Sequence, residues 1–180
     1  TLMRTCEGLV QNNCKKIILT INSKSYLFEE EILKIKNKIT INIKIFKENK
    51  PLGECGALWE IEDKLDNDFL FINGDIIFSI DLQRLFNFHK ELCSGITIVT
   101  HTSTHAFDSD ILSAPNGSLI ETIYPKNKKR AQNIFGYLGN TGIAYINKKI
   151  LKTIDKPNSL DKSSIFNLLI VEAFNKKIKI

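Results

Sequence analysis

The residues best placed for chemistry are Asn73, Gly74 and Asp75, which directly follow the apolar run FLFI at 69–72. This run predicts a strand buried on both faces, as in a parallel sheet covered by helices. In open α/β sheets, ligands bind beyond the carboxyl ends of the strands. A carboxylate there, beside a glycine that lets a phosphate approach, suits a Mg²⁺ ion that carries a nucleotide. Asn-Gly is also the commonest dipeptide of tight turns, so the motif alone leaves open a turn or a metal ligand.

Three further groups of residues have the types that chemistry uses. Asp108 and Asp110 are either a pair of carboxylates for acid–base work or part of a capped loop. A glycine pair, Gly139 and Gly142, interrupts a strand pattern and indicates a β-bulge or a close ligand. The basic run KNKKR at 126–130 is typical of a solvated loop, and no aromatic stacking set accompanies it, which argues against nucleic-acid binding.

The composition bounds the class of protein. At 180 residues, 43% of them hydrophobic and 25% charged, the chain fits one globular domain with a substantial core. No apolar run approaches the roughly 20 residues that span a bilayer, and no signal peptide is recognisable. We therefore expect a cytoplasmic protein without membrane contact. The cysteines are scattered without a metal-binding pattern and are expected to be buried reduced thiols: Cys6, Cys14, Cys55 and Cys93.

The hydrophobic pattern predicts alternating helices and strands over the first hundred residues, the order of a doubly wound α/β sheet. Helices are expected from Leu2 to a stop at Asn12 and Asn13, at 26–35 and 54–64, and after a capping Asp81. Strands are expected at 16–21, 40–46, 69–72 and 95–101. His89, on the last of these helices, fits a histidine at the edge of the core better than a ligand. Such folds usually open with a strand and a glycine-rich loop, so we expect both to lie upstream of Thr1.

The second part of the chain has a different pattern. A hairpin is expected from strands at 111–113 and 118–123, followed by a loop at 125–136. A strand at 137–146, a helix at 166–174 and a final strand beginning at 177 complete the prediction.

Four stretches in this order carry a resemblance: ENKPLGECG at 48–56, FLFINGD at 69–75, DSD at 108–110 and NTGIAY at 140–145. In this combination, over nearly its whole length, the chain resembles the sugar-phosphate nucleotidyltransferases. The resemblance implies a Rossmann-like α/β fold with a doubly wound mixed sheet. It further implies a single domain, incomplete at both ends, with a nucleotide-binding part at 1–102 and a sugar-binding part at 103–180.

The matching positions imply roles for individual residues. The resemblance implies that a loop and the glycine before Asp75 bind the nucleotide, through Glu48, Pro51, Leu52, Gly53, Gly56 and Gly74. It implies that Asp75 holds Mg²⁺ and is catalytic, together with Lys126 near the sugar phosphate. It implies that the sugar contacts Asn140, Thr141 and Gly142. The family's glycine-rich loop and catalytic lysine would precede Thr1, and its second metal-binding aspartate would follow Ile180.

The implied reaction joins a sugar 1-phosphate to a nucleoside triphosphate and releases pyrophosphate. The stretch THAFDSD at 104–110 resembles the branch of the family that makes GDP-heptose, which implies heptose 1-phosphate and GTP as partners. Two alternatives stay open: an enzyme acting on mannose 1-phosphate, and a non-catalytic module that binds nucleotide sugars. The resemblance also leaves open a homo-oligomer.

Overall fold

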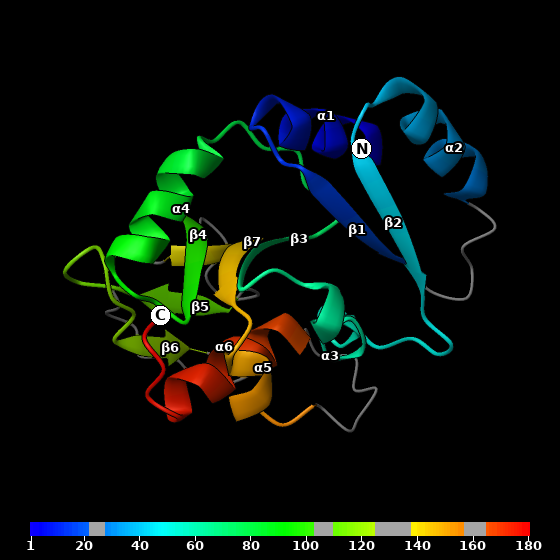
Figure 1. The fold of residues 1–180 in the computed structure, drawn as a ribbon. Coiled ribbons are helices and arrows are strands. Elements are labelled where there is room, and N and C mark those ends of the chain that lie inside the picture. Colours follow the sequence, from blue (N-terminus) through cyan, green and yellow to red (C-terminus); the bar gives the residue numbers. More distant parts are fainter. Residues whose placement is uncertain (22–27, 103–109, 125–137, 157–164) are drawn as a thin grey trace.

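The computed structural model describes residues 1–21, 28–102, 110–124, 138–156 and 165–180 (Figure 1). The described helices are α1 (Leu2–Gln11), α2 (Glu29–Lys38), α3 (Ala57–Glu60), α4 (Leu82–Glu91), α5 (Ile150–Thr153) and α6 (Ile165–Asn175), with a 3₁₀ turn at Glu62–Lys64. The described strands are β1 (Lys16–Ile21), β2 (Asn42–Lys47), β3 (Asp68–Ile72), β4 (Ile96–Thr102), β5 (Ile111–Ser113), β6 (Thr122–Tyr124) and β7 (Leu138–Asn147).

The strands form two sheets, which confirms a mixed α/β fold. β1 and β2 pair in parallel, with Ile17 opposite Ile43. In the second sheet the order is β3-β7-β5-β6, and β4 pairs with the other edge of β7. β3 and β4 both run antiparallel to β7. The expectation of a parallel core over the first hundred residues is therefore wrong for β3, because β7 lies between β3 and β4. β3 is also less covered than predicted, since only Phe69 of its residues is buried.

α1 and α2 cover the β1–β2 pair and bury a small core against it (Figure 1). Cys6 from α1, Ile35 from α2 and Ile17 from β1 are buried together there. Three glutamates open α2 and two lysines lie in its last turn, which matches the helix dipole at both ends. α1 ends at Gln11, and Asn13 follows with a φ of 61°, which an asparagine tolerates better than most residues.

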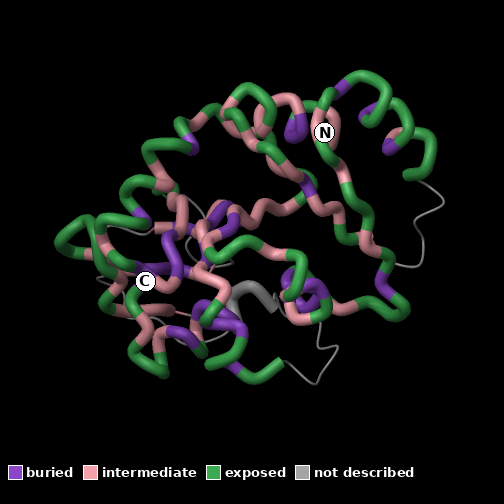
Figure 2. The backbone as a smooth tube through the Cα atoms, viewed as in Figure 1, coloured by how far each residue is buried: buried purple, intermediate pink, exposed green. Residues whose placement is uncertain are grey.

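The larger core lies around β7. Ile146 of β7 and Ile96 of β4 are fully buried and pack with Leu169 and Ala173 of α6. Figure 2 shows buried residues along β7, α3 and α5. Among the helices described, none combines the length and the apolar character needed to cross a lipid bilayer.

Several predicted elements differ from the observed ones. The helix expected at 54–64 is divided into α3 and a 3₁₀ turn. Near the break, Ile61 is buried and the indole N–H of Trp59 donates to the carbonyl of Leu151. The final strand is absent from the described residues after α6. The carbonyl of Lys179 nevertheless accepts hydrogen bonds from Gly95 and Ile96. Cys93, expected to be buried, is exposed at the end of α4.

A polar cluster joins β3 to its neighbours around Asp68. Its carboxylate accepts hydrogen bonds from Lys90 Nζ at 2.8 Å and Asn147 Nδ2 at 2.7 Å, and lies 3.3 Å from His89 Nε2. His89 is buried, and its Nδ1 lies 2.8 Å from the hydroxyl of Thr97. The histidine thus has a structural role, as predicted. Burial by itself raises the pKa of Asp68, but the bonds from Lys90, His89 and Asn147 outweigh it and hold the pKa below 3.8.

We expect the Asp68→Asn variant to lose about 2 kcal/mol of unfolding free energy at neutral pH, because hydrogen bonds to a charged, sheltered group are lost. A carboxyl whose pKa is lowered by folding stabilises the protein above its unfolded pKa, and this contribution disappears as the pH falls through the folded value. The difference between the two proteins, measured by urea unfolding, should therefore shrink as the pH drops below 3.8.

Asp66→Asn is the matched control, since Asp66 is 72% exposed and its pair with Lys16 is expected to contribute little. If Asp66→Asn lost as much unfolding free energy as Asp68→Asn, the stabilising role assigned to Asp68 would be contradicted.

Candidate functional site

The turn that carries Asp75 is attached to β7. Beyond the end of β3, the backbone N–H of Asn73 donates to the carbonyl of Gly142 at 3.0 Å, and Ile76 N–H donates back to Asn73 at 3.2 Å. Gly74 and Asp75 themselves are exposed. A side chain at Gly74 would meet no atom within 4 Å, so this part of the turn is open to a ligand.

β7 contains a bulge opposite β4, which is one of the two alternatives that the glycine pair indicated. Ala144 pairs with Ile98 and Asn140 with Thr100, so three residues of β7 face the single Val99. Gly142 has a φ of +75°, in the left-handed region that favours glycine.

Side-chain hydrogen bonds fix the bulge. The Asn140 side-chain oxygen accepts the Gly142 N–H at 3.0 Å, and the Thr141 hydroxyl donates to the carbonyl of Val99 at 2.7 Å. Asn140 and Thr141, predicted to bind sugar, therefore also stabilise the backbone.

The turn and the bulge interlock at Asn73 and Gly142. A Cβ atom on Gly142 would lie 2.6 Å from Asn73 Nδ2 and 2.9 Å from Ile76 Cδ1, which is closer than real Cβ contacts. The structure thus brings the turn with Asp75, the predicted metal ligand, next to the residues that were predicted to bind the sugar. The sequence places Asn73 in the same motif as Gly74 and Asp75, but it did not indicate that Asn73 contacts the bulge.

The predicted nucleotide loop is held by Glu48, which lies just after β2. Its backbone N–H donates to Ile21 at the end of β1, and its carboxylate Oε2 accepts the N–H of Leu52 at 3.0 Å. Only 9% of Glu48 is exposed. The carboxylate therefore closes the loop over 48–52, a role that the sequence did not indicate.

The rest of this loop turns sharply and enters the core. Gly53 has a φ of +75°, and a Cβ atom on Gly56 would collide with the carbonyl oxygen of Leu52. Pro51 and Gly53 are exposed. Burial raises the pKa of the Cys55 thiol, with a smaller contribution from Glu54, so Cys55 packs as a protonated side chain. The loop is thus fixed at both ends and exposed at its middle.

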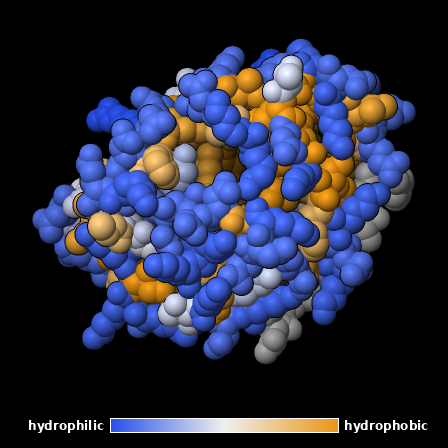
Figure 3. Space-filling model, viewed as in Figure 1, coloured by the Kyte–Doolittle hydropathy of each residue, from blue (hydrophilic) through white to orange (hydrophobic). Residues whose placement is uncertain are grey.

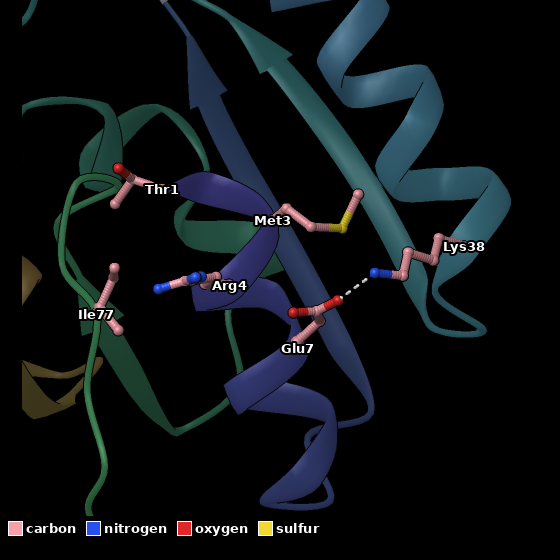
Figure 4. A pocket seen from close by; sticks show the side chains of 6 residues that line it. All are labelled: Thr1, Met3, Arg4, Glu7, Lys38 and Ile77. Carbon is pink, nitrogen blue, oxygen red and sulfur yellow. Dashed lines mark hydrogen bonds and ion pairs between the residues drawn. The ribbon is translucent and has the colours of Figure 1, made fainter.

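An open pocket of about 500 Å³ lies between α1 and the segment after Asp75. It is lined by Thr1, Met3, Arg4, Glu7, Lys38 and Ile77 (Figure 4). Glu7 and Lys38 form an ion pair at 2.6 Å, while Arg4 extends toward the segment that carries Ile77. Figure 3 shows this face of the molecule hollowed between α4 and β1, with hydrophobic residues in the hollow.

Asp75 is the predicted metal ligand, and its exposed side chain offers one carboxylate at this turn. Within the described residues, no three His, Cys, Asp or Glu side chains gather as a metal centre. Mg²⁺ commonly takes one or two carboxylates and completes its shell with substrate phosphates and water. One exposed carboxylate beside an open Gly74 fits that mode of binding. Two other candidates, Lys126 and Asp108, lie outside the described residues.

Sequence comparisons place the chain among known proteins. The model of a protein family described as nucleotidyl transferase matches residues 2–179. The chain is 24% identical over 165 residues to the mannose-1-phosphate guanylyltransferase catalytic subunit beta of Drosophila pseudoobscura pseudoobscura, which covers 89% of this chain and 43% of that protein. It is 33% identical over 94 residues to the D-glycero-alpha-D-manno-heptose 1-phosphate guanylyltransferase of Campylobacter jejuni, which covers 50% of this chain and 40% of that one. The chain thus spans less than half the length of these relatives.

Solved structures have the same fold. HddC from Yersinia pseudotuberculosis superposes with a TM-score of 0.69 at 22% identity, covering 91% of this chain and 72% of that one. A second structure of HddC is complexed with GMP-PN. The inositol-1-phosphate CTP transferase from T. maritima gives a TM-score of 0.72 at 14% identity, covering 99% of this chain and 69% of that one. At these identities the likeness establishes the fold alone.

We expect Gly142→Ala to be destabilised by more than the ~1–2 kcal/mol that a left-handed backbone costs an ordinary residue, because its Cβ also displaces Asn73. Gly117→Ala is the matched control: Gly117 has a φ of +74°, but its Cβ would meet nothing within 4 Å. The free energy of unfolding of both variants, measured in urea, gives the comparison. Equal losses would show that the turn and the bulge are not interlocked.

Proposed function

Because the chain belongs to the nucleotidyl transferase family, we propose that it transfers a nucleotidyl group from a nucleoside triphosphate to a sugar 1-phosphate and releases pyrophosphate. One observation carries the proposal: the turn with Asp75 and the bulge at Asn140–Gly142 are joined by the bond from Asn73 to Gly142. A metal–phosphate site and a sugar site must be adjacent for this reaction, since the sugar phosphate attacks a phosphorus atom of the nucleotide.

The residues of this chain mainly position the two substrates. In the proposed reaction an oxygen of the sugar phosphate attacks the α-phosphorus in line, and pyrophosphate leaves; such chemistry depends on alignment and on stabilisation of charge. Asp75 would hold Mg²⁺, and a bound Mg²⁺ ion would neutralise charge on the phosphates. The loop that Glu48 closes presents exposed backbone at Gly53 to the base, and the bulge contacts the sugar.

The base and the sugar are supported to different degrees. Both sequence relatives are named as guanylyltransferases, which supports GTP. Heptose 1-phosphate is supported by the relative from Campylobacter jejuni, to which the chain is 33% identical. Mannose 1-phosphate is the second candidate, because the relative from Drosophila pseudoobscura pseudoobscura aligns with 89% of this chain. Pyrophosphate release from each of the four common nucleoside triphosphates, with either sugar phosphate, separates the candidates.

We expect Asp75→Asn to reduce pyrophosphate release by about 100-fold or more, because an amide replaces the charged oxygen ligand that Mg²⁺ prefers. The measurement is turnover of GTP with heptose 1-phosphate or mannose 1-phosphate across a range of Mg²⁺ concentrations. A non-catalytic module that binds nucleotide sugars would instead show no turnover in either protein and nearly unchanged binding.

Asp81→Asn is the control for Asp75→Asn. Asp81 lies in the same segment and accepts the N–H of Arg84 as the N-cap of α4. Asparagine caps helices about as well, so turnover should be unchanged. If the two variants behave alike, Asp75 has no special role.

A second pair of variants distinguishes two roles of the Glu48 carboxylate, closure of the loop and direct contact with the base. If its carboxylate only closes the loop, Glu48→Gln should keep the bond to Leu52 and retain the KM for the nucleotide. Glu48→Ala should raise that KM by about tenfold, since the loop loses its internal hydrogen bond. A loss in Glu48→Gln as large as in Glu48→Ala would indicate direct contact between the carboxylate and the base.

A further inference from the structure

The segment between β3 and α4 has no regular secondary structure, yet one face of α1 holds it along its length. The Thr5 hydroxyl donates to the carbonyl of Ile76 at 2.6 Å, and Asn12 Oδ1 accepts the N–H of Leu82 at 3.0 Å. Between them, a Cβ atom on Gly8 would lie 3.2 Å from the ring of Phe78. Residues 5, 8 and 12 are spaced three and four apart, so they share one face of the helix.

Thr5 makes the contact nearest to the turn. It is 4% exposed, on a helix whose other buried residue is Cys6, and its hydroxyl reaches the residue immediately after Asp75. A buried hydroxyl needs a hydrogen-bond partner, and the Ile76 carbonyl is a backbone group that no strand satisfies. The bond therefore fixes the backbone on the α1 side of the turn, while the bond from Asn73 to Gly142 fixes it on the β7 side.

We propose that Thr5 is a positioning residue for the nucleotidyl transfer: its hydrogen bond to Ile76 holds the turn at the place where Asp75 meets the metal-bound phosphates. This inference rests on the proposed function. It extends that function to α1, to which none of the chain's motifs assigns a role. A turn held on two sides keeps the carboxylate in place before the substrate arrives, which avoids an ordering cost during binding.

The test compares Thr5→Val, which removes the hydroxyl, with Thr5→Ser, which keeps it. Thr97→Val is the matched control, because Thr97 is also a buried threonine, 6% exposed, with a hydroxyl bonded to His89 in another part of the molecule. Amide hydrogen exchange of residues 73–80 is measured by mass spectrometry on the full chain. The Mg²⁺ concentration that gives half-maximal turnover is measured in parallel.

We expect Thr5→Val to speed exchange at 73–80 by about fivefold, the factor that one hydrogen bond of ordinary net strength gives, and to raise the required Mg²⁺ concentration to a similar extent. Thr5→Ser and Thr97→Val should match the unmodified chain in both measurements. Unchanged exchange in Thr5→Val, an unchanged Mg²⁺ requirement, or equal effects in Thr97→Val would each overturn the inference.

Failure of the proposed function gives a different result. If the unmodified chain and Asp75→Asn turn over alike, or neither does, the proposed reaction is rejected for this chain. The exchange measurement then decides by itself whether Thr5 holds the turn.

Discussion

The site depends on the pairing of β7 with β3 on one edge and β4 on the other. Because β7 is bonded on both sides, its bulge at Gly142 cannot relax without disturbing both neighbours. The bulge turns the Gly142 carbonyl toward the N–H of Asn73, and this single backbone bond continues the β3–β7 ladder into the turn with Asp75. The position of the exposed carboxylate is thereby determined by the pairing of β3 with β7.

Polar side chains near the site divide into two groups by what they contact. Asn140, Thr141 and Glu48 use polar atoms in hydrogen bonds with the backbone, where each replaces a bond that regular secondary structure would otherwise supply. The carboxylate of Asp75, by contrast, is exposed. Irregular backbone costs free energy unless its polar groups form hydrogen bonds. The hydrogen bonds of Asn140, Thr141 and Glu48 therefore make it possible for Asp75 to lie at the surface.

The sequence was sufficient for features that depend on local chemistry. Asp81 was predicted to cap α4, and its side chain accepts the N–H of Arg84. The glycine pair in the strand before Ile143 predicted the bulge, because only glycine readily adopts the left-handed φ that Gly142 has. The hydrophobic pattern located β2 and β4 to within two residues.

Features that depend on contacts between residues far apart in the chain could not be predicted from the sequence. An apolar run such as FLFI indicates a covered strand, but the same run fits a parallel or an antiparallel neighbour, so the pairing with β7 was not predictable. For the same reason the sequence predicted no role for Thr5. Its role becomes visible only when Ile76, 71 residues away, is seen to accept its hydrogen bond. Residues that touch substrates carry motifs, whereas the residues that hold them in place are recognised from the fold.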